Sequence, residues 1–175
     1  MSTKYYDWSA YHASMRGDKV AIVDLDTQEE VTYGALEDRA SRLAEWLQSQ
    51  GVIKGDRVTL LTPNCPEVFE AQFACSKIGA ICIPLNWRLT VPELEYILGD
   101  SAPKVLVYDA KFAEAAEQLI STCCVPSSLL LDAEDAACAY KQTLAALTGA
   151  YHGAECTLDD VAMIMYTSGT TGHPK

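Results

Sequence analysis

Several residue patterns that mark common classes of protein are missing from this chain of 175 residues. It has three histidines and no C-x-x-C pair, so the usual ligand spacings of a structural zinc site are absent. It also lacks any run of lysine or arginine, and its 24 acidic against 13 basic residues give a formal net charge of -11. Because such a balance repels a phosphate backbone, we expect no nucleic-acid partner.

Long apolar runs are missing as well. The N-terminus has no apolar core of the kind found in a signal peptide. The longest apolar-leaning stretch, 71–85, contains Lys77 and Gly79 and is shorter than the ~20 residues that span a bilayer. We therefore expect no transmembrane segment. The seven cysteines are odd in number and are expected to be reduced and mostly buried, which predicts a cytoplasmic location.

What the chain does contain is an alternation of strand-like and helix-like segments. Residues 21–33 predict a β-hairpin, and residues 33–50 carry apolar side chains at helical spacing before Gly51. A T-x-x-E capping box at Thr90 and Glu93 marks the start of another helix. Further strands are predicted over 57–63, 80–85, 104–109, 127–131 and 158–166, and further helices over 67–77, 110–120 and 134–147. This order predicts an α/β fold with a mainly parallel sheet and right-handed crossovers.

The last ten residues, YTSGTTGHPK, form the most chemically suggestive segment. They follow the apolar run 161–165, and in an α/β sheet ligands gather at the carboxyl ends of strands. Two glycines let the backbone approach a ligand closely, four hydroxyls add donors, and Lys175 adds a positive charge. The segment therefore predicts a polyphosphate cradle, although a polar turn between strands uses the same residue types. Its spacing is not that of a P-loop, so a P-loop kinase or GTPase is disfavoured.

YTSGTTGHPK resembles the phosphate-binding signature of the adenylate-forming (AMP-binding) superfamily, which includes acyl-CoA synthetases, firefly luciferase and peptide-synthetase adenylation domains. The stretches 31–58 and 75–98 resemble two further family motifs in the same order, so the resemblance covers about residues 20–175. Within the family, PLNWRLT at 84–90 is more similar to acyl- and aryl-CoA ligases.

The resemblance implies a two-step reaction. A carboxylic acid, expected to be a fatty acid, reacts with ATP and Mg²⁺ to give an acyl-adenylate, and coenzyme A then displaces AMP to form a thioester. A hydroxycinnamate-type aryl acid is the alternative substrate. The positions that would hold the β- and γ-phosphates are Thr167, Ser168, Gly169, Thr170, Thr171, Gly172 and Lys175. His173 stands at a variable family position, and no catalytic or metal-binding residue is assigned.

The resemblance also implies that residues 1–175 are a partial N-terminal domain of an acyl-CoA ligase that ends in the loop 166–175. The adenine, ribose and acyl contacts would belong to the remainder of the same polypeptide, so this piece alone is expected to be inactive. A truncated sheet would expose an edge strand and favour association, for example as a homodimer. The alternative from another class is a stand-alone, non-catalytic binding or regulatory module built on the same fold.

Two further expectations concern single side chains. Trp8, Trp46 and Trp87 are expected to be packing anchors, because each can bury a large apolar area. Arg88 is expected to form a salt bridge with a nearby carboxylate, and the alternative is contact with an anionic substrate.

Overall fold

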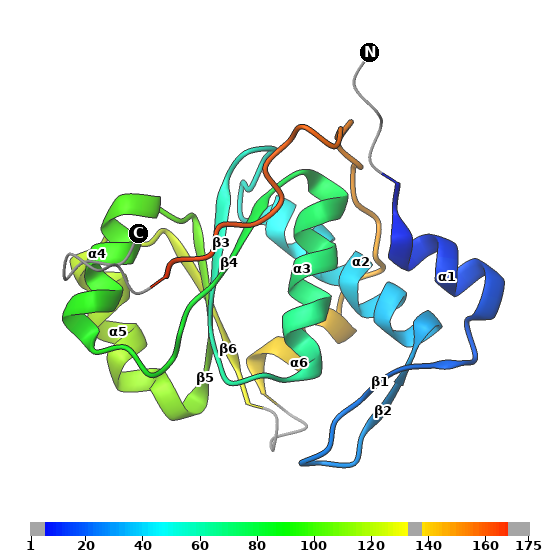
Figure 1. Ribbon diagram of the computed structural model, residues 1–175, viewed down its shortest axis with the longest axis horizontal. Helices are drawn as coiled ribbons and strands as arrows, with labels where there is room; N and C mark the ends of the chain where they lie inside the picture. Colours follow the sequence, from blue (N-terminus) through cyan, green and yellow to red (C-terminus); the bar gives the residue numbers. More distant parts are fainter. Residues whose placement is uncertain (1–5, 133–137, 168–175) are drawn as a thin grey trace.

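A computed structural model describes residues 6–132 and 138–167 of the chain. These residues form a four-stranded parallel sheet in the order β4-β3-β5-β6 (Figure 1). The strands are β3 (Arg57–Leu61), β4 (Ile81–Pro84), β5 (Val105–Asp109) and β6 (Ser127–Leu131). The predicted α/β fold and its parallel strand pairing are therefore confirmed.

Helices cover both faces of this sheet (Figure 1). On one face lie α2 (Tyr33–Ser49), α3 (Pro66–Ile78) and α6 (Ala139–Ala145), and on the other lie α4 (Val91–Ser101) and α5 (Ala113–Thr122). Along β3, the alternating side chains of Leu60 and Leu61 enter the two different cores. Apolar residues therefore fill both faces of the strands, as a buried parallel sheet requires.

The N-terminal part of the chain packs outside α2. The predicted hairpin is confirmed as β1 (Val20–Val23) paired antiparallel with β2 (Glu30–Thr32). Before it lies α1 (Trp8–Arg16), which the sequence analysis did not predict and which begins where the carboxylate of Asp7 accepts from Ala10 N. The N-terminal segment is therefore helical and lies against α2 (Figure 1).

The ends of three helices can be compared with the predictions from the sequence. At α4, the carboxylate of Glu93 accepts from both the backbone N and the hydroxyl of Thr90, so the predicted capping box is present. The predicted helix 110–120 is divided into a 3₁₀ turn, η1 (Ala110–Phe112), followed by α5. The predicted helix 134–147 is shorter than expected and begins at Ala139, with residues 133–137 outside the described part of the chain.

Side-chain burial tests the expectations for cysteine and tryptophan. All seven cysteines are free, but only Cys75, Cys82 and Cys138 are buried, so the expectation that most of them would be buried is wrong. Trp46 and Trp87 pack against the two cores, whereas the side chain of Trp8 is 55% exposed, so its predicted packing role is wrong.

Over the residues described, no helix combines the length and apolarity that a membrane span needs.

Gly79 ends α3 in a left-handed conformation and leaves little room for a side chain. Its φ is +70°, and a Cβ there would lie 2.9 Å from Lys54 Cγ and 3.0 Å from Cys156 Sγ. At Gly51, φ is +78° but a Cβ would meet nothing within 4 Å. We expect Gly51→Ala to lower the free energy of unfolding by about 1 kcal/mol through backbone strain alone, and Gly79→Ala by about 2 kcal/mol through strain plus crowding. Urea denaturation measures both, and equal losses would contradict the crowding argument.

Candidate functional site

The segment that leads into the motif contacts the free edge of the sheet at β4. Cys82 N donates to Ala162 O at 3.1 Å and Ile164 N donates to Cys82 O at 3.1 Å, which makes a parallel bridge between Cys82 and Met163. The prediction of a strand over 158–166 is therefore wrong in extent. Among the described residues of this segment, pairing with β4 is limited to this one bridge. Its first residues instead form a turn, in which the carboxylate of Asp160 accepts from Thr157 N at 2.8 Å.

Tyr166, the first residue of the motif, lies against α4. Its hydroxyl donates to Asp100 Oδ2 at 2.5 Å, and its ring packs on the core beneath α4 and α5. Asp100 is in the last turn of α4, which leads into β5, so this contact is at the amino end of the sheet. The expected position at the carboxyl ends of the strands is therefore wrong for Tyr166. Because the segment has a single bridge to β4, backbone pairing fixes its position only as far as Ile164. Beyond that residue, packing of Tyr166 against α4 determines where the chain runs.

Of the residues predicted to hold phosphate, Thr167 is exposed at the end of the described segment. The remaining ones lie outside the described residues: Ser168, Gly169, Thr170, Thr171, Gly172 and Lys175. Their role in phosphate binding stays a prediction.

A cavity of about 200 Å³ lies at the carboxyl ends of β3 and β4. Thr62, Asn64, Asn86 and Arg88 supply its polar lining. The guanidinium of Arg88 lies 4.0 Å from the centre of the Trp87 ring, and Arg88 N donates to Asn86 Oδ1 at 3.1 Å. One positive charge among hydroxyl and amide groups suits an anionic ligand.

This cavity revises the expectations for its residues. Arg88 stacks on Trp87, and among the described residues it makes no ion pair, so the predicted salt bridge is wrong. Thr62, Asn64 and Asn86 were not predicted from the sequence, although polar residues directly after two predicted parallel strands are a usable signal for such a site. In the part of the chain that is described, no three His, Cys, Asp or Glu side chains are placed to hold a metal ion.

The contact between Tyr166 and Asp100 can be tested by titration. Burial, and then the hydrogen bond to Asp100, raises the pKa of Tyr166 to about 12. A tyrosine with a raised pKa adds stability that is present below about pH 10 and is lost as pH rises through its folded pKa. The tyrosinate absorbance of the wild type minus that of Tyr166→Phe should therefore have its midpoint near 12. Asp100→Asn should move this midpoint down, and an unchanged midpoint would contradict the contact.

A parallel sheet covered by helices on both faces, with a polar cavity at the carboxyl ends of its strands, is the architecture typical of ligand-binding domains of the α/β class. The family model described as "AMP-binding enzyme" matches residues 10–175, and the chain belongs to this family.

Relatives from bacteria agree with the family. The chain is 37% identical over 157 residues to the long-chain-fatty-acid–CoA ligase FadD13 of Mycobacterium tuberculosis, covering 89% of this chain and 30% of that protein. It is 40% identical over 173 residues to the feruloyl-CoA synthase of Amycolatopsis sp, covering 96% of this chain and 31% of that protein. The chain therefore spans about a third of the length of these curated relatives.

Solved structures show the same fold. The crystal structure of the N-terminal domain of FACL13 from Mycobacterium tuberculosis, bound to an inhibitor, has a TM-score of 0.84 and 34% identity, covering 99% of this chain and 43% of that one. The anthranilate CoA ligase AuaEII in complex with anthranoyl-AMP has a TM-score of 0.88 and 25% identity, covering all of this chain and 33% of that one. The predicted membership of the adenylate-forming family, with its acyl-CoA ligase relatives, is confirmed.

Proposed function

We propose that residues 1–175 are a partial N-terminal domain of an AMP-forming acid–thiol ligase that uses ATP, Mg²⁺ and coenzyme A. The observation that carries this proposal is YTSGTTGHPK at 166–175 in a chain that belongs to the AMP-binding family. In the first step a carboxylate oxygen attacks the α-phosphate of ATP, and pyrophosphate leaves. In the second step the thiol of coenzyme A attacks the acyl carbon, the thiol proton is released and AMP leaves.

In this proposal the loop 166–175 holds the β- and γ-phosphates at the carboxyl edge of the sheet. The bridge between Cys82 and Met163 sets a register that would place Thr167 opposite Asn86 if the pairing continued along β4. Four residues of strand advance about 13 Å, which is far enough to bring the loop to the cavity lined by Asn86 and Arg88. The bridge supports this placement, which requires Tyr166 to leave Asp100.

For the acid we propose a fatty acid. Two relatives support this choice: FadD13, a long-chain-fatty-acid–CoA ligase, and a fatty acid–[acyl-carrier-protein] ligase that is 32% identical over 145 residues. An aryl acid is the second candidate, favoured by the 40% identity to a feruloyl-CoA synthase. The free thiols support a reducing, cytoplasmic setting. A homodimer stays a proposal, for which size measurement in solution is the test.

Pyrophosphate release tests the function and the expected inactivity of this piece together. The 175-residue chain and a version extended to the natural stop codon would each receive ATP, Mg²⁺ and coenzyme A with saturated fatty acids or with ferulate. We expect turnover by the extended protein alone, because the adenine, ribose and acyl contacts would come from the added residues. Turnover by the short chain would refute its expected inactivity. A stop codon directly after Lys175 would instead favour the stand-alone binding or regulatory module.

A further inference from the structure

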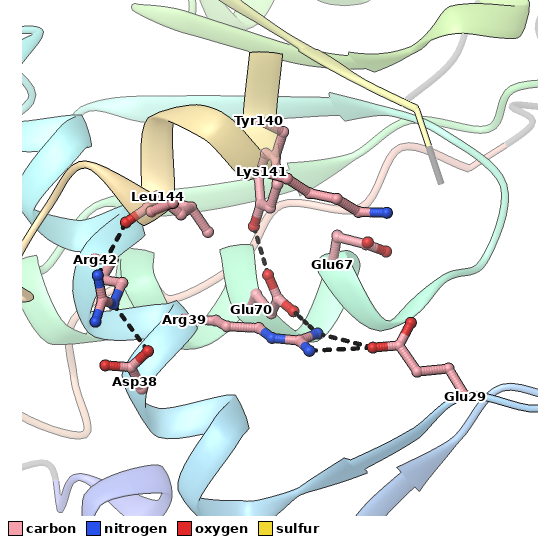
Figure 2. Close-up of a pocket in the computed structure, with 10 residues that line it drawn as sticks. Glu29, Asp38, Arg39, Arg42, Glu67, Glu70, Tyr140, Lys141 and Leu144 are labelled. Atoms are coloured by element: carbon pink, nitrogen blue, oxygen red, sulfur yellow. Dashed lines mark hydrogen bonds and ion pairs between the residues drawn. The ribbon is translucent and has the colours of Figure 1, made fainter. Parts of the chain in front are cut away.

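A second and larger cavity, of about 580 Å³, lies between α2, α3 and α6 (Figure 2). It is on the face of the sheet opposite to α4 and α5 (Figure 1). Its lining carries seven charged side chains, the carboxylates Glu29, Asp38, Glu67 and Glu70 and the cations Arg39, Arg42 and Lys141. Cavities of a few hundred Å³ with a small number of fixed polar groups are typical binding sites for small molecules.

Most of the charges in this cavity have partners. Glu70 is fully buried, and its carboxylate accepts from Arg39 Nη1 at 3.2 Å and from Tyr140 Oη at 2.7 Å (Figure 2). The guanidinium of Arg39 also donates to Glu29 Oε1 at 3.1 Å. One guanidinium is therefore shared between two carboxylates, and it has no charge left over for a third.

Glu67 is a carboxylate of this lining that has neither Arg39 nor Arg42 as a partner, since Arg42 pairs with Asp38 at 2.8 Å. Only 8% of this residue is exposed, and its Oε2 atom is buried with no hydrogen-bond partner in the structure. Its place in the first turn of α3 puts it near the positive end of the helix dipole, which offsets about half a charge. A buried carboxylate oxygen without a donor is costly, so this atom has an unused capacity to accept a hydrogen bond.

The surrounding groups also experience the negative charge of Glu67. Burial, and then the charge of Glu67, raises the pKa of the Cys65 thiol to about 12. Burial is likewise the main cause of the raised pKa of Glu70, and Glu67 adds to it. Across the whole lining, four carboxylates face the three cations Arg39, Arg42 and Lys141, so the cavity has one negative charge in excess.

We propose that this cavity binds an organic cation, an ammonium or guanidinium group, with Glu67 Oε2 as the acceptor that fixes it. A metal ion is disfavoured, because the described residues include no group of three side chains suited to hold one. The cation has two sources, a free amine or a Lys or Arg side chain of a longer parent polypeptide. The inference is independent of the proposed ligase activity.

Calorimetric titration of the 175-residue chain with putrescine, a linear diamine, tests the proposal. We expect saturable binding of one diamine per chain, and no binding of the matching diol, which has the same shape without the charge. Glu67→Gln keeps the size of the side chain and should weaken binding at least about tenfold through loss of the charged acceptor. The matched control is Glu117→Gln, an exposed change on α5 across the sheet, which should leave the affinity unchanged.

The same titration on a longer parent distinguishes the two sources. Binding to both proteins would identify a free amine, whereas binding to the short chain alone would identify a Lys or Arg side chain that fills the cavity in the parent. Absence of saturable binding to the short chain, or equal binding of diamine and diol, would overturn the proposal. So would wild-type affinity in Glu67→Gln. If that variant failed to fold, as seen by circular dichroism, the diamine-to-diol comparison on the wild type would still decide.

Discussion

Replacing Lys77 by methionine should lower the free energy of unfolding of this chain by about 3 kcal/mol. The side chain of Lys77 is 1% exposed, and its ammonium group lies 2.8 Å from Asp7 Oδ2 and 2.7 Å from Glu37 Oε1. Methionine has a similar length but leaves both carboxylates without their cation. The carboxylates are 31% and 20% exposed, so the loss should be at the lower end of the range for a broken buried ion pair.

The ion pairs of Lys77 join segments that are far apart in the sequence. Asp7 caps α1, Glu37 belongs to α2 and Lys77 belongs to α3, while the ammonium group also lies 5.4 Å from the centre of the Tyr151 ring. Loss of this cation should therefore loosen α1 first. Hydrogen exchange of the α1 amides in Lys77→Met should be faster than in the wild type.

Lys54→Met is the matched control, because it removes the same charge from a lysine that is 43% exposed and pairs with Asp160 at 2.8 Å. A solvated ion pair contributes little, so urea denaturation should show almost no change for this variant. Equal effects of the two substitutions would contradict the assigned role of Lys77.

The effect of Lys77→Met should depend on pH in a defined direction. Burial opposes the charged form of Lys77, but hydrogen bonds to Asp7 and Glu37 raise its pKa overall. For Asp7, burial is likewise outweighed by the hydrogen bonds from Lys77, Ala10 N and Ser9 together with the charge of Lys77, and its pKa is lowered. The contribution of Asp7 is lost as pH falls below about 3.9, and that of Lys77 is lost as pH rises above about 10.4. The difference between wild type and variant should therefore be largest between these limits.

The contacts of Lys77 illustrate which parts of the fold could be predicted from the sequence and which could not. The hairpin, α2 and the four parallel strands follow from local apolar spacing and local turn residues, so they were predicted. In α1 the only buried residue is Ser9, so no apolar stripe marks this helix. Its position depends on the contact of Asp7 with Lys77, 70 residues away, which no local pattern contains.

In the candidate sites, too, local patterns could be predicted from the sequence and tertiary contacts could not. The family motif at 166–175 is a local pattern and identified the family correctly. The path of Tyr166 depends on whether β4 or α4 holds it, and residue composition does not decide between them. Stacking of Arg88 on Trp87 and the unpartnered carboxylate of Glu67 are likewise outcomes of tertiary packing.

In the longer parent protein that the proposed function assumes, Lys175→Met should lower kcat/KM for acyl-adenylate formation about 100- to 1,000-fold. Lysine is a point positive charge that suits the oxygens of pyrophosphate, where negative charge develops as the bond to the α-phosphate breaks. Methionine keeps most of the side-chain length and removes that charge. Exchange of labelled pyrophosphate into ATP, in the presence of the acid, measures this step without coenzyme A.

His173→Ala is the control within the same loop, because the family resemblance gives this position no role. It should leave the exchange rate near the wild-type value, which would separate loss of the charge from general disturbance of the loop. The kinetic constants of Lys175→Met also separate binding from chemistry. Loss of a charge that acts mainly in the transition state lowers kcat, whereas loss of a charge that holds ATP equally throughout raises KM alone. Wild-type exchange in Lys175→Met, or an equal loss in both variants, would refute the assignment of Lys175 to the phosphates and leave the loop as a polar turn.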